Sequence, residues 1–350
     1  MRPKPCDTHT DGYAWPMNPE LPSVNGYQVV AGPPHDLGEL TELVTAVESA
    51  IDGSSSMTDS YMQVMIADPD VEPIPNNVQI RSPESGALVG FGRYVNKTPH
   101  VESITLAWVD PEHEGAGIGT ALTSWGLRRS RSMISMAPPG SRVTNRCEAS
   151  GNNAAAAELL AHNGYAVDRH FLEMELELHD PVEIVEFPSE VSVRTMQGPQ
   201  DIEVIVDPLW AAFQDHYGWT DSPRDARIAR WHRFRGADEW DDSLVWIVES
   251  SGGVVAVNAC LRSFGAKTDI GYVASLGVIQ QWRGMGIARA LLTTAFAEFH
   301  RRGKRAVALH VDADSLTGAT RLYESVGMQA VQTEVAYLVE LRAGTDLVVR

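Results

Sequence analysis

A basic, glycine-broken segment at residues 280–292, with the sequence QQWRGMGIARALL, restricts the folds open to this chain more than any other feature. It leads directly into an apolar-periodic stretch that predicts an amphipathic helix over residues 287–302. A glycine loop at the start of a helix leaves several backbone N–H groups unpaired, and the helix dipole favours an anion at that end. The segment therefore predicts a strand–loop–helix unit that binds a diphosphate.

This unit occurs twice in the chain. The stretch DPEHEGAGIGTAL at residues 110–122 matches the later segment, so that Gly115 and Gly284 lie in equivalent loops, 169 residues apart. Downstream, AELLAHNGY matches TRLYESVGM, which places Gly164 and Gly327 at equivalent positions 163 residues apart. Two matches in the same order and at a similar separation indicate a duplicated domain, because the period is too long for a solenoid repeat.

Length and composition agree with two globular domains. The 350 residues exceed one ordinary hydrophobic core, and 43% of them are hydrophobic and 21% charged. The segment HDPVEIVEFPSE at residues 179–190 combines two prolines with acidic residues and marks the boundary. We expect a Pro-rich tail over residues 1–25, a first domain over 26–181 and a second domain over 182–350.

Charge, hydropathy and cysteine content exclude several classes of function. The net charge of −18 argues against nucleic-acid binding, which requires many cationic contacts to phosphates. No stretch approaches the roughly 20 apolar residues that span a bilayer, and the N-terminus lacks the apolar core of a signal peptide. Cys6, Cys147 and Cys260 match no metal or disulfide spacing, so we expect a cytoplasmic protein without a metal. The sequence leaves a homodimer open.

Periodicity gives the second copy the order of a mixed α/β domain. Its predicted strands and helices alternate as follows: strands over 192–195, 244–249, 254–261, 270–278, 306–311 and 333–341, and helices over 201–217, 224–234, 287–302 and 317–326. The first copy follows the same plan, with a helix over 37–51 and strands over 78–80, 87–95 and 103–109 before its glycine loop.

This order, with a Q-x-x-G-x-G loop between an apolar strand and a long helix and an A-x-x-L-Y-x-x-x-G pattern near the end, resembles the GCN5-related N-acetyltransferase (GNAT) superfamily. The resemblance covers nearly the whole chain past the tail, twice over. It implies an α/β (α+β) fold of two tandem domains, each a mixed, mostly antiparallel central sheet flanked by helices. It also implies acetyl-CoA as co-substrate and a small-molecule amine as acceptor.

The same resemblance implies where the cofactor binds. The loop amides would hold the diphosphate of coenzyme A, and the strand before the loop would lie along the pantetheine arm. Backbone N–H groups of that strand can donate to the thioester carbonyl and to the oxyanion that forms there. Glycines in the loop permit a positive φ, and Arg283 adds a positive charge. The implied cofactor residues are Leu276, Gly277, Val278, Gln281, Arg283, Gly284, Met285, Gly286, Ile287 and Ala288.

Tyr323 matches the family tyrosine that donates a proton to the departing thiolate of coenzyme A. A phenol with a pKa of about 10 is protonated at neutral pH and is able to do so. The alternative is a tyrosine that packs on its helix. The general base is left open between Asp215 and His216, in a region that lines the acceptor site in this family, and His310 or Asp312 on a later strand.

A structural role explains His216 equally well, because the helix dipole favours a histidine at a helix C-terminus. We expect His310 to be an ordinary strand residue. The predicted catalytic residues are therefore Tyr323, Asp215 and His216, of which only Tyr323 rests on a specific motif.

The first copy departs from the pattern at the chemically important positions. Glu112 and Glu114 replace Gln281 and Arg283, and two carboxylates beside a diphosphate repel it. Leu160 replaces the tyrosine, so the acid for the thiolate is missing. We therefore expect an acyl-CoA-dependent N-acyltransferase whose C-terminal domain is catalytic and whose N-terminal domain is not. The alternative is a non-catalytic acyl-CoA-binding sensor or interaction module.

Overall fold

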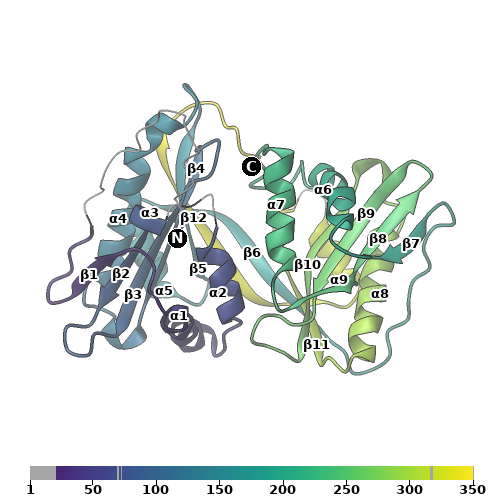
Figure 1. Ribbon diagram of the computed structural model, residues 1–350, viewed down its shortest axis with the longest axis horizontal. Coiled ribbons are helices and arrows are strands. Elements are labelled where there is room, and N and C mark those ends of the chain that lie inside the picture. Colours follow the sequence, from purple (N-terminus) through teal and green to yellow (C-terminus); the bar gives the residue numbers. More distant parts are fainter. Residues whose placement is uncertain (1–20, 69–70, 72, 316–317, 350) are drawn as a thin grey trace, which may run out of the picture.

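The computed structural model describes residues 21–68, 71, 73–315 and 318–349 (Figure 1). Most of the predicted tail, Cys6 and the predicted first residue of the last helix, Thr317, lie outside these residues. The described residues form one sheet of 12 strands, with helices packed on both faces. For convenience, residues 26–181 are called the N-terminal half and residues 182–350 the C-terminal half.

The N-terminal half supplies six strands and five α-helices to this arrangement. The strands are β1 (Gln28–Ala31), β2 (Asn77–Arg81), β3 (Leu88–Val95), β4 (Glu102–Val109), β5 (Val143–Ser150) and β6 (Ala166–Glu177). The helices are α1 (Leu37–Asp52), α2 (Asp59–Ile66), α3 (Pro73–Asn76), α4 (Ile118–Ser132) and α5 (Ala154–His162), with 3-10 turns η1 (Pro111–His113) and η2 (Ile134–Met136).

The C-terminal half repeats the plan. Its strands are β7 (Ser192–Thr195), β8 (Trp240–Ser250), β9 (Gly253–Leu261), β10 (Ile270–Val278), β11 (Ala306–Asp312) and β12 (Gln329–Arg342). Its helices are α6 (Asp201–Ala212), α7 (Arg224–Arg235), α8 (Ile287–Arg301) and α9 (Ala319–Ser325), with the 3-10 turn η3 (Gln280–Trp282) before α8. The predicted strands and helices of this half are confirmed as elements, and β7 and β10 have the predicted bounds.

The helix predicted over residues 201–217 is too long, because α6 ends at Ala212. The next residues form successive turns, in which the His216 N–H donates to the Phe213 carbonyl at 3.0 Å. Tyr217 continues the apolar period of the helix, but its hydroxyl donates to Asp168 of β6 instead of facing the core of its own half. The apolar period therefore extends beyond the end of the helix, and Tyr217 is positioned by its contact with β6 instead.

The backbone geometry of the two glycine loops is nearly the same, which confirms the duplication. Gly284 and Gly286 have φ angles of 78° and 85°, and their counterparts Gly115 and Gly117 have 76° and 83°. Each pair lies between a 3-10 turn and the long helix of its half. These positive values favour glycine, because a side chain is strained there.

The two halves exchange their last strands. The strand order is β1-β2-β3-β4-β5-β12-β6-β11-β10-β9-β8-β7, so β12 completes the sheet of the N-terminal half and β6 that of the C-terminal half. β6 pairs antiparallel with both β11 and β12, and the two exchanged strands cross at the centre of Figure 1. The sequence repeat predicts that both copies contain the same series of strands. It does not predict whether the last strand of a copy pairs within its own copy or with the other one.

Each half packs its sheet between two layers of helix. On one face of the C-terminal half, α8 buries Leu291, Ala295 and Phe296 against Val248 and Val255. On the other face, α6 packs against β8 and β9. In the N-terminal half, α4 and the α1–α2 pair cover opposite faces in the same way.

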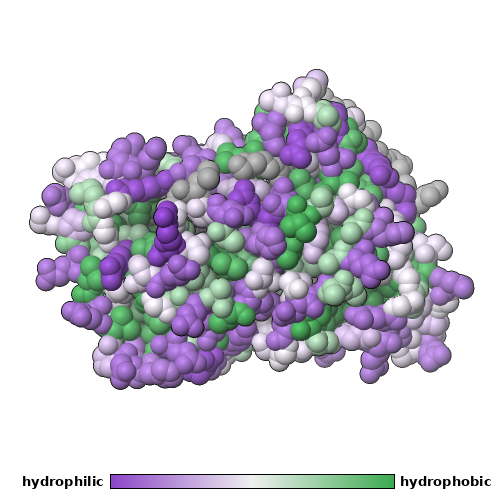
Figure 2. Space-filling model, turned by 180° about the vertical axis from the view of Figure 1, so that it is seen from behind, coloured by the Kyte–Doolittle hydropathy of each residue, from purple (hydrophilic) through white to green (hydrophobic). Residues whose placement is uncertain are grey.

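The surface seen in Figure 2 carries both hydrophilic and hydrophobic residues. On the side opposite to Figure 1, hydrophobic residues form separate patches among hydrophilic ones (Figure 2). Within residues 21–68, 71, 73–315 and 318–349, no helix has both the length and the apolar content needed to cross a bilayer.

In both halves a pair of parallel strands diverges. β10 and β11 are paired only from Ile270–Ala306 to Tyr272–Ala308, and beyond these residues they separate. β4 and β5 separate in the same way after Ile104. The register of β10 against β9 also shifts between Val273 and Ser275, which is a β-bulge, whereas β4 pairs with β3 without interruption. A bulge redirects backbone groups, so the two openings differ in which N–H groups they present.

Candidate active site

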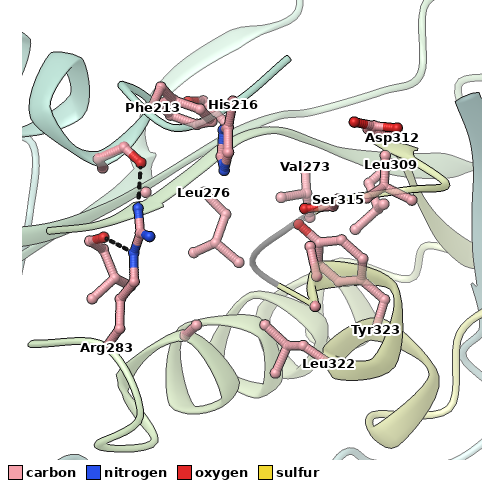
Figure 3. Close-up of a pocket in the computed structure, with 18 of the residues that line it drawn as sticks. Phe213, His216, Val273, Leu276, Arg283, Leu309, Asp312, Ser315, Leu322 and Tyr323 are labelled. Carbon is pink, nitrogen blue, oxygen red and sulfur yellow. Dashed lines mark hydrogen bonds between the residues drawn. The ribbon is translucent and has the colours of Figure 1, made fainter. Parts of the chain in front are cut away.

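A cavity of about 630 Å³ lies in the C-terminal half where β10 and β11 diverge (Figure 3). Its walls come from β10, from the glycine loop with the start of α8, from residues 213–217 after α6, and from β11 with α9. Tyr323, Asp215 and His216 all line this cavity. The structure therefore brings together residues that are more than 100 positions apart in sequence.

The glycine loop presents the N-terminus of α8 to the cavity. Gly286 precedes the helix in the left-handed conformation, without a side-chain cap, and the helical bonding starts with the Ala290 N–H, which donates to the Gly286 carbonyl at 3.0 Å. The N–H groups before Ala290 are those that a helix cannot satisfy itself. N–H groups of this kind are able to bind an anion, which is the role that the sequence predicts for this loop.

Most of the predicted cofactor residues line the cavity, and two do not. Gln281 and Met285 have exposed side chains outside it, and 43% of Met285 is accessible. The members that line the cavity are Leu276, Gly277, Val278, Arg283, Gly284, Gly286, Ile287 and Ala288.

Gly277 has a packing role that the motif does not reveal. A Cβ atom at this position would lie 2.9 Å from Leu209 Cδ2 and 3.0 Å from the Ala212 Cβ. The glycine therefore lets α6 lie directly on β10. This close approach places the segment that follows α6, with Asp215 and His216, at the rim of the cavity.

Tyr323 enters the cavity from α9, and its hydroxyl points toward Ser315 in Figure 3. Tyr323 is one of the residues that line the cavity, where a ligand can reach it. Burial raises the pKa of Tyr323 to about 12. The phenol is thus protonated at neutral pH, as a proton donor must be.

Asp215 and Arg283 form an ion pair at the opposite wall. The Arg283 Nη2 donates to Asp215 Oδ1 at 3.0 Å, and Nη1 donates to the other carboxylate oxygen. The same guanidinium donates to the backbone carbonyls of Ala212, at 2.7 Å, and Val278, at 3.1 Å. It therefore faces the end of α6, and the hydrogen bonds from Arg283 hold the pKa of Asp215 below its usual value.

His216 lies beside this ion pair with its ring edge toward the cavity (Figure 3). The imidazole packs edge-on against Phe213, with ring centroids 4.6 Å apart. Burial lowers the pKa of His216, and the nearby Asp215 opposes this effect only in part. The ring is therefore neutral at neutral pH and able to accept a proton.

The two other candidates for the base are engaged by neighbours. The Tyr272 hydroxyl is hydrogen-bonded to His310 Nδ1 at 2.9 Å, and His310 Nε2 is 3.8 Å from a Glu173 carboxylate oxygen. Asp312 lies 3.4 Å from a guanidinium nitrogen of Arg169. Both residues line the cavity, but each already has a polar partner within the protein.

The residues that β6 contributes to the cavity were not predicted from the sequence. Arg169 and Phe171 line the cavity although they precede the predicted domain boundary at residue 181. The Arg169 guanidinium lies over the Tyr217 ring, 4.4 Å from its centroid. Arg169 and Phe171 reach the cavity because β6 pairs with the C-terminal half, and no local sequence pattern indicates this exchange. A second missed residue, Arg289, is exposed on the first turn of α8 and lines the cavity near the glycine loop.

In the N-terminal half, buried polar side chains lie next to the point where β4 and β5 begin to diverge. Asn145 is fully buried there, donates to the Ser103 hydroxyl at 3.0 Å, and accepts a hydrogen bond from Tyr165. Leu160, at the position of Tyr323, is buried as well, and Glu112 is exposed on its loop. This half therefore repeats the backbone of the glycine loop but lacks the tyrosine.

Among the described residues, no group of three or more His, Cys, Asp or Glu side chains is arranged to hold a metal ion. Diverging parallel strands, a bulged strand edge, an uncapped glycine–helix junction and a partly buried phenol are thus found together, as the resemblance to the GNAT superfamily implies. In class, the fold and the site are those of a coenzyme A-dependent acyltransferase.

Comparison with known proteins agrees with this class. The profile of the acetyltransferase (GNAT) family matches residues 206–328. The mycothiol acetyltransferase of Arthrobacter sp. (strain FB24) is 28% identical over 287 residues, which cover 81% of each protein. The mycothiol acetyltransferase of Thermomonospora curvata is 30% identical over 237 residues, which cover 66% of this chain and 77% of that protein.

Solved structures share the fold over most of the chain. A GCN5-related N-acetyltransferase from Sphaerobacter thermophilus superposes with a TM-score of 0.73 at 26% identity and covers 94% of this chain and 99% of its own. A tandem GNAT protein from the clavulanic acid biosynthesis pathway shares the fold, with a TM-score of 0.66 at 14% identity over 91% of this chain and 99% of its own.

The chain belongs to the GNAT family and is an N-acetyltransferase with a tandem arrangement of the fold. Acetyl-CoA is the co-substrate of this family, and the mycothiol acetyltransferase relatives imply a small-molecule acceptor.

Proposed function

We propose that the chain transfers acetyl directly from acetyl-CoA to a small-molecule primary amine, in the C-terminal half, with Tyr323 as the acid for the leaving thiolate. The observation that carries this proposal is the cavity at the divergence of β10 and β11. Its walls combine an anion site, an open strand edge, a protonated phenol and a neutral imidazole, which are the groups that the reaction needs.

The glycine loop and β10 hold the acetyl donor. The N–H groups at the start of α8 bind the diphosphate, and Arg289 is the exposed cation closest in sequence to that site. Arg283 is directed to Asp215 and is not assigned to the diphosphate. Beyond the bulge at Val273–Ser275, N–H groups of β10 donate to the thioester carbonyl and stabilise the charge that develops on its oxygen.

The chemical step breaks one bond and forms another. The amine nitrogen attacks the thioester carbonyl carbon, an N–C bond forms and the C–S bond breaks. The Tyr323 hydroxyl gives its proton to the leaving sulfur, since burial keeps the phenol protonated. His216 accepts the proton that the amine loses, because its imidazole is neutral. Asp215 is already paired with Arg283 and positions the segment that carries His216.

The acceptor enters from a second cavity of about 780 Å³ between the two halves. Ala274 and Ser275, at the bulge of β10, line both cavities, so the two spaces meet beside the reacting end of the site. Side chains of the N-terminal half, such as Arg93 and Lys97, line the second cavity. The N-terminal half thus helps to bind the acceptor and does not itself catalyse the reaction, because it has Leu160 at the position of Tyr323.

The relatives named as mycothiol acetyltransferases make one acceptor the first to test, namely the amine that yields mycothiol on acetylation. Glucosamine and spermidine complete a small panel of amines. We place the reaction in the cytoplasm, where the buried free thiols of Cys147 and Cys260 remain reduced.

The decisive experiment measures thiol release from acetyl-CoA in the presence of each amine. We expect acceleration by at least one amine, and a fall in kcat of roughly 10²-fold or more for Tyr323→Phe, with the affinity for acetyl-CoA unchanged. Tyr272→Phe is the matched control, since it removes a phenol that does not line the cavity and is hydrogen-bonded to His310.

The competing hypothesis is a sensor that binds acetyl-CoA without turnover. It would be supported if no amine accelerated thiol release while acetyl-CoA still raised the melting temperature. An equal loss of activity in Tyr323→Phe and Tyr272→Phe would remove Tyr323 from its role as the specific acid.

A further inference from the structure

The chain after β12 returns from the N-terminal half to the C-terminal half. In Figure 1 its yellow trace leaves the top of β12 and runs across to the neighbourhood of α7. We call residues 343–349 the crossing segment, and residues 213–220, which follow α6 and carry Asp215 and His216, the acceptor loop.

The crossing segment is fixed at its start to the N-terminal half. The Thr345 N–H donates to the Gly140 carbonyl at 2.9 Å, and the Arg142 N–H donates to the Thr345 carbonyl at 2.8 Å. The Arg142 side chain adds a hydrogen bond of 2.9 Å to the Asp346 carboxylate. Val348 is then buried, with 6% of its surface exposed, in a cluster with Val101 and other residues of that half.

The end of the crossing segment is fixed to the acceptor loop. The Gly218 N–H donates to the Val349 carbonyl at 2.8 Å, and the Val349 N–H donates to the Trp219 carbonyl at 3.1 Å. Gly218 has a φ of 79°, which a residue with a side chain adopts only with strain. Two adjacent residues therefore contact different halves. Val348 is buried in the N-terminal half, and the backbone of Val349 is hydrogen-bonded to the C-terminal half.

This junction lies where the two cavities meet. Val349 lines the first cavity and Val348 the second. The acceptor loop divides in the same way, because His216 and Tyr217 line the first cavity and Gly218 lines the second. Ala274 and Ser275, at the bulge of β10, also line both cavities at this junction.

On its other side the acceptor loop is held by β6. The Tyr217 hydroxyl donates to Asp168, and the Arg169 guanidinium covers the Tyr217 ring. The loop is therefore fixed between an exchanged strand of the N-terminal half and a segment anchored to that half. Its position depends on how the two halves are arranged.

We propose that the crossing segment holds the acceptor loop in its reactive position and frames the passage through which the amine reaches the thioester. The part of this proposal that concerns the amine rests on the proposed function. The part that concerns the loop does not, because it follows from the backbone hydrogen bonds of Val349.

Val349→Pro tests the proposal in the full-length chain, because proline keeps an apolar side chain and removes the N–H that donates to Trp219. Hydrogen exchange of residues 213–220 should rise roughly fivefold, the factor expected for the loss of one ordinary hydrogen bond. Leu347→Ala is the matched control, since its side chain is 43% exposed and it is a neighbour in the same segment. Unchanged exchange in Val349→Pro, or an equal rise in Leu347→Ala, would overturn the proposal.

Val348→Ala provides a second variant that keeps every backbone donor and loosens only the buried anchor. With the most active amine of the panel, both Val348→Ala and Val349→Pro should raise the KM for the amine several-fold and leave the KM for acetyl-CoA unchanged. A parallel rise in both KM values would show a general loss of structure and contradict the proposal. If no amine were active, the proposed function would fail, while the exchange measurements would still decide the role of the crossing segment.

Discussion

Arg283 and Asp215 are joined by two hydrogen bonds, so the cation of the glycine loop is tied to the acceptor loop rather than to the start of α8. A guanidinium matches a carboxylate with two parallel N–H groups, which an ammonium cannot do. The remaining donors of Arg283 reach the carbonyls of Ala212 and Val278. This side chain therefore links the end of α6 to the end of β10, the two elements between which the acceptor has to approach the thioester.

Asp215→Asn keeps the shape of the side chain and removes the charge that binds Arg283. Because the acceptor loop loses charge-assisted hydrogen bonds, we expect the KM for the amine to rise roughly 10-fold or more, with a smaller change in kcat. Arg283→Lys should behave similarly. Steady-state kinetics check both variants, and a fall in kcat beyond roughly 10²-fold with an unchanged KM would instead identify Asp215 as the base.

His216 predicts the pH dependence of the reaction. Burial lowers the pKa of this imidazole, and a base has to be neutral in order to accept a proton. The value of kcat/KM should therefore stay constant near neutral pH and fall only as the pH decreases through a pKa below 6.5. His216→Gln should lower kcat roughly 10²-fold and remove this acidic limb.

This prediction is tested by measuring kcat/KM as a function of pH for the wild type and for His216→Gln. His310→Gln is the control, because this second histidine of the cavity is already hydrogen-bonded to Tyr272. An acidic limb that survives in His216→Gln would exclude His216 as the base.

The locally encoded parts of this structure could be predicted from the sequence. Glycine spacing, apolar period and the 169-residue repeat depend on neighbouring residues, so β10, the loop and α8 follow from them. The strand exchange could not be predicted, since β6 and β12 have the same pattern whichever half they pair with. The contributions of Arg169 and Val349 to the cavity were missed for that reason.

Arg169→Met tests whether a residue of the N-terminal half belongs to the acceptor end of the site. The change removes the contact with the Tyr217 ring and the ion pair with Asp312, which lies at 3.4 Å. We expect the KM for the amine to rise roughly 3- to 10-fold, which is the factor for the loss of a partly exposed cation–π contact. Because both contacts are on the acceptor side, the binding of acetyl-CoA should not change.

Isothermal titration with acetyl-CoA and steady-state kinetics with the amine separate the two effects. Arg128→Met is a matched control, because Arg128 is exposed on α4 of the same half, away from both cavities. Weaker acetyl-CoA binding in Arg169→Met would show that Arg169 serves the cofactor instead.

Glu334 makes the stability of the sheet depend on pH. It lies on β12 between Ser150 of β5 and Phe171 of β6, where the exchanged strands meet. Burial, and then the negative charge of Glu148, raise the pKa of Glu334 from 4.5 to about 7, and Arg146 offsets this only in part. The folded state therefore holds a proton that the unfolded chain releases more readily.

The direction of the effect follows from linkage. A carboxyl whose pKa is higher in the folded state contributes stability that is fully present below pH 4.5 and is lost as the pH rises through about 7. Glu334→Gln mimics the protonated form at every pH. The melting temperature of this variant should exceed that of the wild type by a margin that widens between pH 5.5 and pH 8, reaching roughly 3–6 °C. Glu340→Gln on the same strand, whose exposed carboxylate pairs with Arg142, should show no such widening. A constant difference for Glu334→Gln across this range would mean that Glu334 is already ionised in the folded protein.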